Sequence, residues 1–138
     1  MFRTAAALVL TLAVATPAMA ADITGRWRTP GNGGEVEVYK CGAAICGRLI
    51  TSAHLRHDPS ALDAKNKDAA QRGRKLKGLT FLTGFSGGPT EWKGGKVYNP
   101  EDGATYSGSI AAPDANTLKL KGCVVAPLCK TQTWTRME

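Results

Sequence analysis

The sequence predicts an all-β protein, a small antiparallel barrel or sandwich of about eight or nine strands. Three observations support this fold class. Short runs rich in β-branched and aromatic residues recur along the chain, and clusters of Gly, Pro, Asn and Asp separate them. Only one stretch, near residues 60–75, departs from this pattern. With 138 residues in all, the chain is long enough for one domain with its own core.

The predicted strands follow in order, with a turn signal between most neighbours. PGNGG separates the first two strands, and the CGAAIC stretch forms a second hairpin. Gly94-Gly95 between extended runs predicts a two-residue hairpin, since both residues can take a positive φ. PEDG at 100–103 and PDAN at 113–116 predict further turns. The predicted strands cover residues 25–29, 35–41, 45–52, 78–85, 90–93, 96–99, 104–110, 117–123 and 130–137.

The segment at residues 60–78, here called the insertion, is rich in Ala and charged residues. Ser60 is a suitable helix N-cap and Gly73 a suitable stop signal. We therefore expect a short helix or an ordered loop across one mouth of the barrel. Long insertions between hairpins are often functional.

The first 20 residues have the pattern of a secretory signal peptide. Arg3 precedes an apolar run from Ala5 to Ala15, and Ala18-Met19-Ala20 is a small-x-small cleavage site. No stretch approaches the roughly 20 apolar residues that a membrane-spanning helix needs. We expect cleavage after Ala20, a single domain over residues 21–138, and a periplasmic or secreted monomer.

Four cysteines, an even number, read as disulfides in an oxidising compartment. We favour Cys41–Cys46 and Cys123–Cys129, because each pair brackets a short turn-like segment between extended runs. A zinc site built from all four thiolates is the alternative, but the five residues between Cys123 and Cys129 exceed the usual spacing.

The chain carries a net charge of +7. The excess concentrates in the insertion, at Lys65, Lys67, Arg72, Arg74, Lys75 and Lys77. Outside the cytoplasm nucleic acid is not an expected partner, whereas an anionic envelope surface is available. An ordinary solvated face is the alternative interpretation.

Several motifs together resemble a known family. GRW near the mature N-terminus and WTR at the C-terminus resemble the ends of calycins, the lipocalin-like small barrels. More specifically, the chain resembles the DUF2147 family of exported bacterial proteins over nearly the whole mature sequence. The motifs are D-x-x-N at Asp63 and Asn66, R-x-R-x-L-x-G over 72–78, W-x-G-G-x-x-Y-x-P over 92–100, G-x-x-Y at Gly103 and Tyr106, and Q-x-W-x-R over 132–136. The resemblance implies a calycin-like, lipocalin-like β-barrel.

Closure of such a barrel is expected to involve Gly25, Trp27 and Arg136. A cation–π contact between Arg136 and Trp27 would fasten the last strand to the first and remove both sheet edges. We favour this structural role over ligand contact.

No catalytic constellation is visible, so we expect a non-enzymatic protein without metal or cofactor. Bridged cysteines leave no thiol nucleophile, and the sequence contains no G-x-S-x-G elbow in a strand-helix context. His54 and His57 have helical ligand spacing, but Ser52 and Pro59 favour a loop and a third ligand is not evident.

Two functions from different classes remain. The first is binding of a small amphipathic or apolar ligand inside the barrel. The second is a protein-interaction module, an inhibitor of an exported hydrolase or an envelope-assembly partner, that uses loops and a basic face. A hollow interior favours the first and a solidly packed core the second. The candidate ligand-binding residues are Asp63, Asn66, Arg72, Arg74, Trp92, Tyr98, Tyr106, Gln132 and Trp134.

Overall fold

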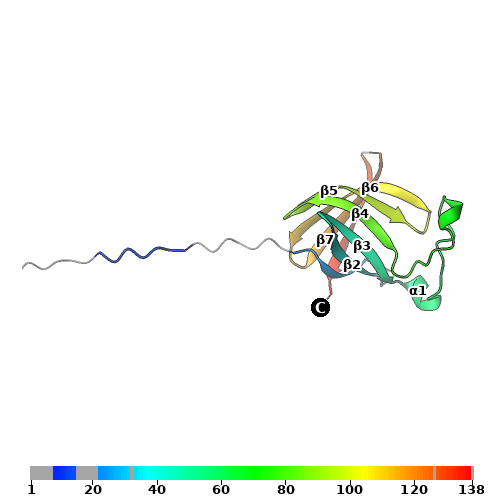
Figure 1. Ribbon diagram of the computed structural model, residues 1–138, viewed down its shortest axis with the longest axis horizontal. Coiled ribbons are helices and arrows are strands. Elements are labelled where there is room, and N and C mark those ends of the chain that lie inside the picture. Colours follow the sequence, from blue (N-terminus) through cyan, green and yellow to red (C-terminus); the bar gives the residue numbers. More distant parts are fainter. Residues whose placement is uncertain (1–7, 15–21, 32, 126, 138) are drawn as a thin grey trace, which may run out of the picture.

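The computed structural model shows a closed barrel of eight antiparallel strands (Figure 1), which confirms the predicted fold class. It describes residues 8–14, 22–31, 33–125 and 127–137. The strands are β1 (Gly25–Arg28), β2 (Glu35–Cys41), β3 (Ala44–Thr51), β4 (Thr80–Gly87), β5 (Glu91–Asn99), β6 (Ala104–Asp114), β7 (Thr117–Val125) and β8 (Leu128–Arg136). The predicted cleavage point after Ala20 lies outside the described residues.

Each strand pairs with its neighbours in sequence, and β1 pairs with β8 to close the sheet. In such a meander, successive connections lie at alternate ends of the barrel. The closed end carries the β2–β3, β4–β5 and β6–β7 hairpins, and the open end carries the other connections, including the insertion between β3 and β4. The open end is therefore where long loops can reach a ligand.

The Gly94-Gly95 hairpin prediction is wrong. β5 runs straight through both glycines, and the register shifts between Trp92 and Gly95 as in a β-bulge. Gly94 takes a positive φ of 72°. A Cβ on Gly95 would lie 2.4 Å from the Phe85 ring. These glycines therefore serve a bulge and a close packing contact, uses of glycine that resemble a turn in sequence.

The true β4–β5 turn lies earlier, at residues 87–91. It contains a cis Gly88-Pro89 peptide, and Gly87 and Gly88 both have positive φ.

The helix α1 (Ala53–His57) lies just before the insertion, where a loop was expected. Ser52 caps it by accepting a hydrogen bond from the Leu55 N–H at 3.2 Å. Serine is common in loops, but it is also a preferred helix N-cap, and Ser52 has the second role here. The insertion itself is an ordered loop with one 3-10 turn, η1 (Ala69–Gln71). No helix in the described ranges is long and apolar enough to span a membrane.

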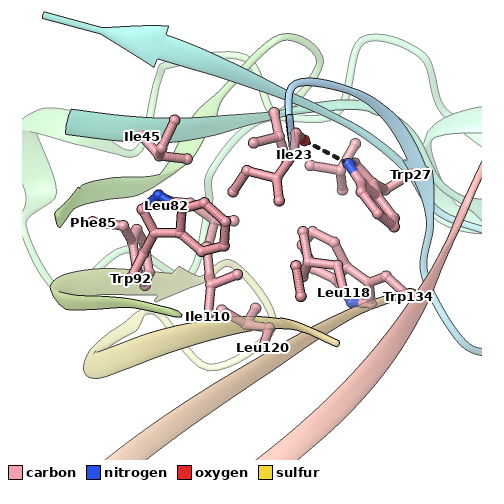
Figure 2. Close-up of a cluster of buried hydrophobic side chains, with 13 residues drawn as sticks. Ile23, Trp27, Ile45, Leu82, Phe85, Trp92, Ile110, Leu118, Leu120 and Trp134 are labelled. Carbon is pink, nitrogen blue, oxygen red and sulfur yellow. Dashed lines mark hydrogen bonds between the residues drawn. The ribbon is translucent and has the colours of Figure 1, made fainter. Parts of the chain in front are cut away.

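Figure 2 shows the cluster of buried hydrophobic side chains that forms the core. The core occupies the closed half of the barrel and extends to Val36, Leu120 and Trp134, which also line the cavity at the open end. Trp27, Leu82, Phe85 and Leu118 are fully buried there. The Trp27 indole N–H donates to the Ile23 carbonyl at 2.9 Å, which holds the segment before β1 against the core. A smaller cluster of Leu55, Ala61 and Leu76 attaches α1 and the insertion to the barrel.

Arg136 lies at the seam where β8 pairs with β1, opposite Trp27. Its guanidinium lies 4.4 Å from the centroid of the Trp27 ring. It also donates to the backbone carbonyls of Asp22, Thr24 and Ala115, at 2.7, 3.0 and 2.6 Å. One side chain thus joins the first strand, the last strand and the β6–β7 turn.

Both predicted cysteine pairs are present, with Cα–Cα distances of 5.8 Å for Cys41–Cys46 and 4.0 Å for Cys123–Cys129. The first bridges the β2–β3 hairpin at the closed end. The second bridges directly opposed residues near the tip of the β7–β8 hairpin at the open end. Together they use all four thiols, so the zinc alternative is wrong.

Candidate functional site

The open half of the barrel is hollow. A cavity of about 930 Å³, here called the cup, opens between the strands at this end. Its apolar walls include Val36, Leu49, Val97 and Leu120, and Phe81 and Trp134 border it with their rings 6.3 Å apart. This volume lies in the range of pockets for small ligands.

The cup exists because interior positions near the open end carry small or slender side chains. Gly34 and Gly122 line it, whereas the bulky Trp27, Phe85 and Trp92 lie in the core and line no part of it. A Cβ on Gly122 would meet only the Tyr106 Cβ, at an ordinary distance of 3.8 Å. The sequence therefore leaves space on this interior face of β7.

Polar residues share the lining of the cup with the apolar ones; those in or next to the connections at the open end include Thr29, Ser52, His54, Asn99, Glu101 and Asp102. Lys130, Gln132 and Trp134 alternate along β8 and all line the cavity. Gln132 accepts a hydrogen bond from the Trp134 indole N–H at 3.1 Å through its Oε1. Tyr106 reaches the rim, where its hydroxyl donates to the Asp102 carboxylate. A cavity with apolar walls and polar residues around its mouth suits an amphipathic ligand.

The predicted cluster of polar residues in the insertion forms a network around Asp63, whose side chain is fully buried. A lone antiparallel bridge between Leu62 and Lys75 sets Asp63 beside Arg74. Asp63 accepts hydrogen bonds from the Tyr98 hydroxyl at 2.5 Å, from Arg74 Nε at 2.8 Å and from Asn66 Nδ2 at 2.8 Å. The Arg74 guanidinium also lies 5.1 Å from the centroid of the Tyr98 ring.

The network determines the charge state of its members. Burial alone acts to raise the pKa of Asp63, but the hydrogen bonds from Asn66, Tyr98 and Arg74 outweigh it and lower that pKa. Burial, followed by the hydrogen bond to Asp63, raises the pKa of Tyr98. Asp63 is therefore an anion and Tyr98 a neutral donor at neutral pH.

A backbone contact completes the attachment of the insertion to the barrel. Gly103, in the β5–β6 turn, has a φ of 70°, and a Cβ there would lie 1.8 Å from the Lys65 carbonyl oxygen. The insertion backbone therefore packs directly on this turn. Between them lies a smaller groove of about 460 Å³, bordered by Asn66, Arg74 and Tyr98.

The candidate residues fall into two main groups, and Tyr98 belongs to both, because it bonds to Asp63 and also borders the cup. Tyr106, Gln132 and Trp134 line the cup. Asp63, Asn66 and Arg74 form the insertion network, and the exposed Arg72 supports it by donating from Nε to the Asn66 carbonyl at 2.8 Å. Trp92 is buried in the core and lines neither cavity.

Tyr98 and Tyr106 do not face each other across strands β5 and β6. Tyr98 pairs with Thr105, and Tyr106 pairs with Val97. Because side chains alternate along a strand, the two tyrosines fall on opposite faces of the sheet. Tyr98 reaches out to Asp63 and borders both cavities, whereas Tyr106 borders the cup alone.

Two of the six basic residues in the insertion are engaged in contacts within the insertion itself. Arg74 is paired with Asp63, and Arg72 is bonded to the Asn66 backbone. Both arginines are therefore part of the scaffold that holds the insertion.

Sequence reasoning missed most of the cup wall, including Val36, Leu49, Val97 and Leu120. It also missed Lys130, although the alternation that groups Gln132 with Trp134 extends one step to it. Gly122 gives a second signal, a glycine at an interior position of a strand.

Asp63→Asn is expected to lower the free energy of unfolding at pH 7 by about 1.5–3 kcal/mol, the range for hydrogen bonds to a charged group. The pKa of Asp63 is lowered in the folded state from about 3.9 in the unfolded chain, so its contribution is present above that value. It is lost as the pH falls through the folded value. Urea unfolding across this pH range should show the two proteins converging in acid.

Glu101→Gln is the matched control, since it neutralises an exposed carboxylate at the same rim. It should change the free energy of unfolding by no more than about 0.5 kcal/mol. A stability gap for Asp63→Asn that stayed constant down to acid pH would contradict a stabilising carboxylate.

Comparisons with known proteins agree with this architecture. A family model described as an uncharacterized protein conserved in bacteria, DUF2147, matches residues 25–136. Among solved structures, protein HP1028 from Helicobacter pylori, described as belonging to the lipocalin family, matches with a TM-score of 0.77. It is 25% identical in sequence, and the match covers 86% of this chain and 84% of that chain. No curated protein matches the chain significantly.

Proposed function

The chain belongs to the DUF2147 family and folds as a lipocalin-like barrel. From this premise we propose that it is a non-catalytic exported protein that binds a small amphipathic or apolar ligand in the cup. The observation that carries this proposal is the half-filled barrel. Large aromatic side chains fill the closed half, and the open half holds a cavity of about 930 Å³.

The chemistry of the cup supports an amphipathic ligand. Its wall is mainly aliphatic and aromatic, and this part of the wall would take the apolar portion of a ligand. Gln132 accepts a hydrogen bond from Trp134 at its Oε1 atom. Its amide N–H groups donate to no partner among the described residues. Lys130 lies nearer the mouth and has no ion pair among the described residues. A polar or anionic head group near the mouth would satisfy these donors.

The alternative, a protein-interaction module, draws less support from this arrangement. It would rely on the loops and the basic insertion, and two arginines of that insertion are bound to the insertion's own residues. A hollow interior has no evident role in such a module.

Export is part of the proposal. Its support is the leader pattern in residues 1–20 and the two bridged cysteine pairs, which fit an oxidising compartment.

Titration with a dansyl-labelled fatty acid tests the binding proposal. We expect saturable binding with one probe per protein, accompanied by a blue shift of the dansyl emission as the probe leaves water. An unlabelled long-chain amphiphile should displace it. Native mass spectrometry of the protein isolated from its own envelope fraction would then identify the resident ligand by mass. Absence of saturable binding together with a ligand-free native spectrum would refute the proposal.

A further inference from the structure

The tip of the β7–β8 hairpin exposes an apolar surface. Val124, Val125 and Leu128 are 68%, 67% and 70% exposed. Elsewhere in residues 22–137, as far as the structure describes them, Leu62 is the one other large hydrophobic side chain that is exposed. Together with Pro127, these three residues form what is here called the hairpin tip. In Figure 1 the orange tip extends beyond the neighbouring strands.

The tip is held in place by its own hairpin. Cys123 and Cys129 are directly opposed and bridged, and Val125 pairs with Leu128 just beyond them. The disulfide limits the freedom of the hairpin to fold back and bury these side chains. Clustered apolar exposure of this kind indicates a contact surface.

The charge around the tip indicates which surface it contacts. Between Leu120 and Thr131 the sequence contains Lys121 and Lys130 but no Asp or Glu. The acidic residues that border the same cup mouth, Glu101 and Asp102, lie in the separate β5–β6 turn. Lys121 and Lys130 are exposed and lie within a few residues of the tip. An apolar tip flanked by cations matches the interface of an anionic bilayer, where apolar groups enter the acyl boundary and lysines meet the head groups.

The tip is continuous with the cup. Val124, Pro127 and Leu128 also border the cavity at its mouth. An amphiphile that leaves a bilayer beside the tip would therefore meet apolar side chains before it reaches the interior. A protein partner on the tip would give no reason for this continuity.

We propose that the hairpin tip docks the protein on an anionic lipid bilayer and that the bilayer is the source or destination of the ligand in the cup. The second half of this inference rests on the proposed function. The docking itself stands on the tip and its lysines.

Co-flotation with vesicles tests the docking, using phosphatidylcholine alone and phosphatidylcholine mixed with phosphatidylglycerol. We expect binding to the mixed vesicles that weakens with added salt, and little binding to neutral vesicles. Val125→Asp should reduce that binding at least about tenfold, because a carboxylate would have to enter the interface. Val125 borders no part of the cup, so probe binding in vesicle-free buffer should persist.

Leu62→Asp is the matched control. This substitution places the same charge at Leu62, the other exposed large hydrophobic side chain, which lies in the insertion and not in the tip. The variant should retain vesicle binding. Circular dichroism should show that both variants are folded, as expected for exposed positions.

Each outcome separates the two proposals. If the wild type binds the fatty-acid probe but no vesicles, the docking is refuted and the ligand proposal stands. If it binds vesicles but not the probe, the ligand proposal is refuted and the docking stands. Equal vesicle binding by Val125→Asp and the wild type, or equal binding to neutral and anionic vesicles, also overturns the docking.

Discussion

Replacing Trp27 with alanine is expected to lower the free energy of unfolding by about 3–5 kcal/mol, the range for deleting a buried aromatic side chain. Trp27 is completely buried, donates to the Ile23 carbonyl and lies beneath the Arg136 guanidinium. Its removal would leave a cavity in the core and loosen both ends of the chain. Urea unfolding followed by far-UV circular dichroism measures the loss. A loss below about 1 kcal/mol would show that the core does not depend on this ring.

A double-mutant cycle with Arg136→Ala tests the closure itself. Arg136→Ala alone should cost less than Trp27→Ala, because the guanidinium is partly exposed and water can replace some of its hydrogen bonds. The two changes should couple by about 0.5–2 kcal/mol, as expected for a cation–π contact. The control pair is Trp27→Ala with Lys93→Ala, because Lys93 is an exposed cation that, within the described part of the chain, pairs with Glu91 alone. That pair should be additive, and equal coupling in both cycles would contradict a specific contact.

Much of the fold follows from local sequence rules. Short alternating strands between turn signals predict the barrel, and the bracketed cysteines predict both bridges. The error at Gly94-Gly95 has a physical reason. Glycine permits a turn, a bulge and a close approach alike, and only the Phe85 ring across the sheet shows that Gly95 serves the third.

The site was less predictable because it depends on register. Asp63, Asn66 and Arg74 are close in sequence, so their association could be expected. Tyr98, which contacts Asp63 and Arg74, comes from β5, and its outward direction follows from the strand register alone. The cup is harder still, since it depends on small side chains from several strands meeting at one end. No single segment carries that pattern.

Gly122→Phe is expected to prevent ligand binding while leaving the barrel folded. Gly122 lines the cup, has no positive φ, and has room for a side chain beside Tyr106. Phenylalanine also suits a strand better than glycine does. The ring would occupy the space that the ligand needs, so the affinity for the fatty-acid probe should fall about a hundredfold or more, equivalent to about 2.8 kcal/mol. Gly122→Leu should act in the same direction with a smaller added volume.

Thr131→Phe places the same ring on the outer face of the barrel, opposite Lys121, and serves as the matched control. The decisive measurement is the dissociation constant of the dansyl fatty acid for the wild type, Gly122→Phe and Thr131→Phe, each shown to be folded by its melting curve. The proposed function predicts tight binding by the wild type and Thr131→Phe and loss of binding by Gly122→Phe. Unchanged binding by a folded Gly122→Phe would contradict it, because the ligand would then lie outside the cup.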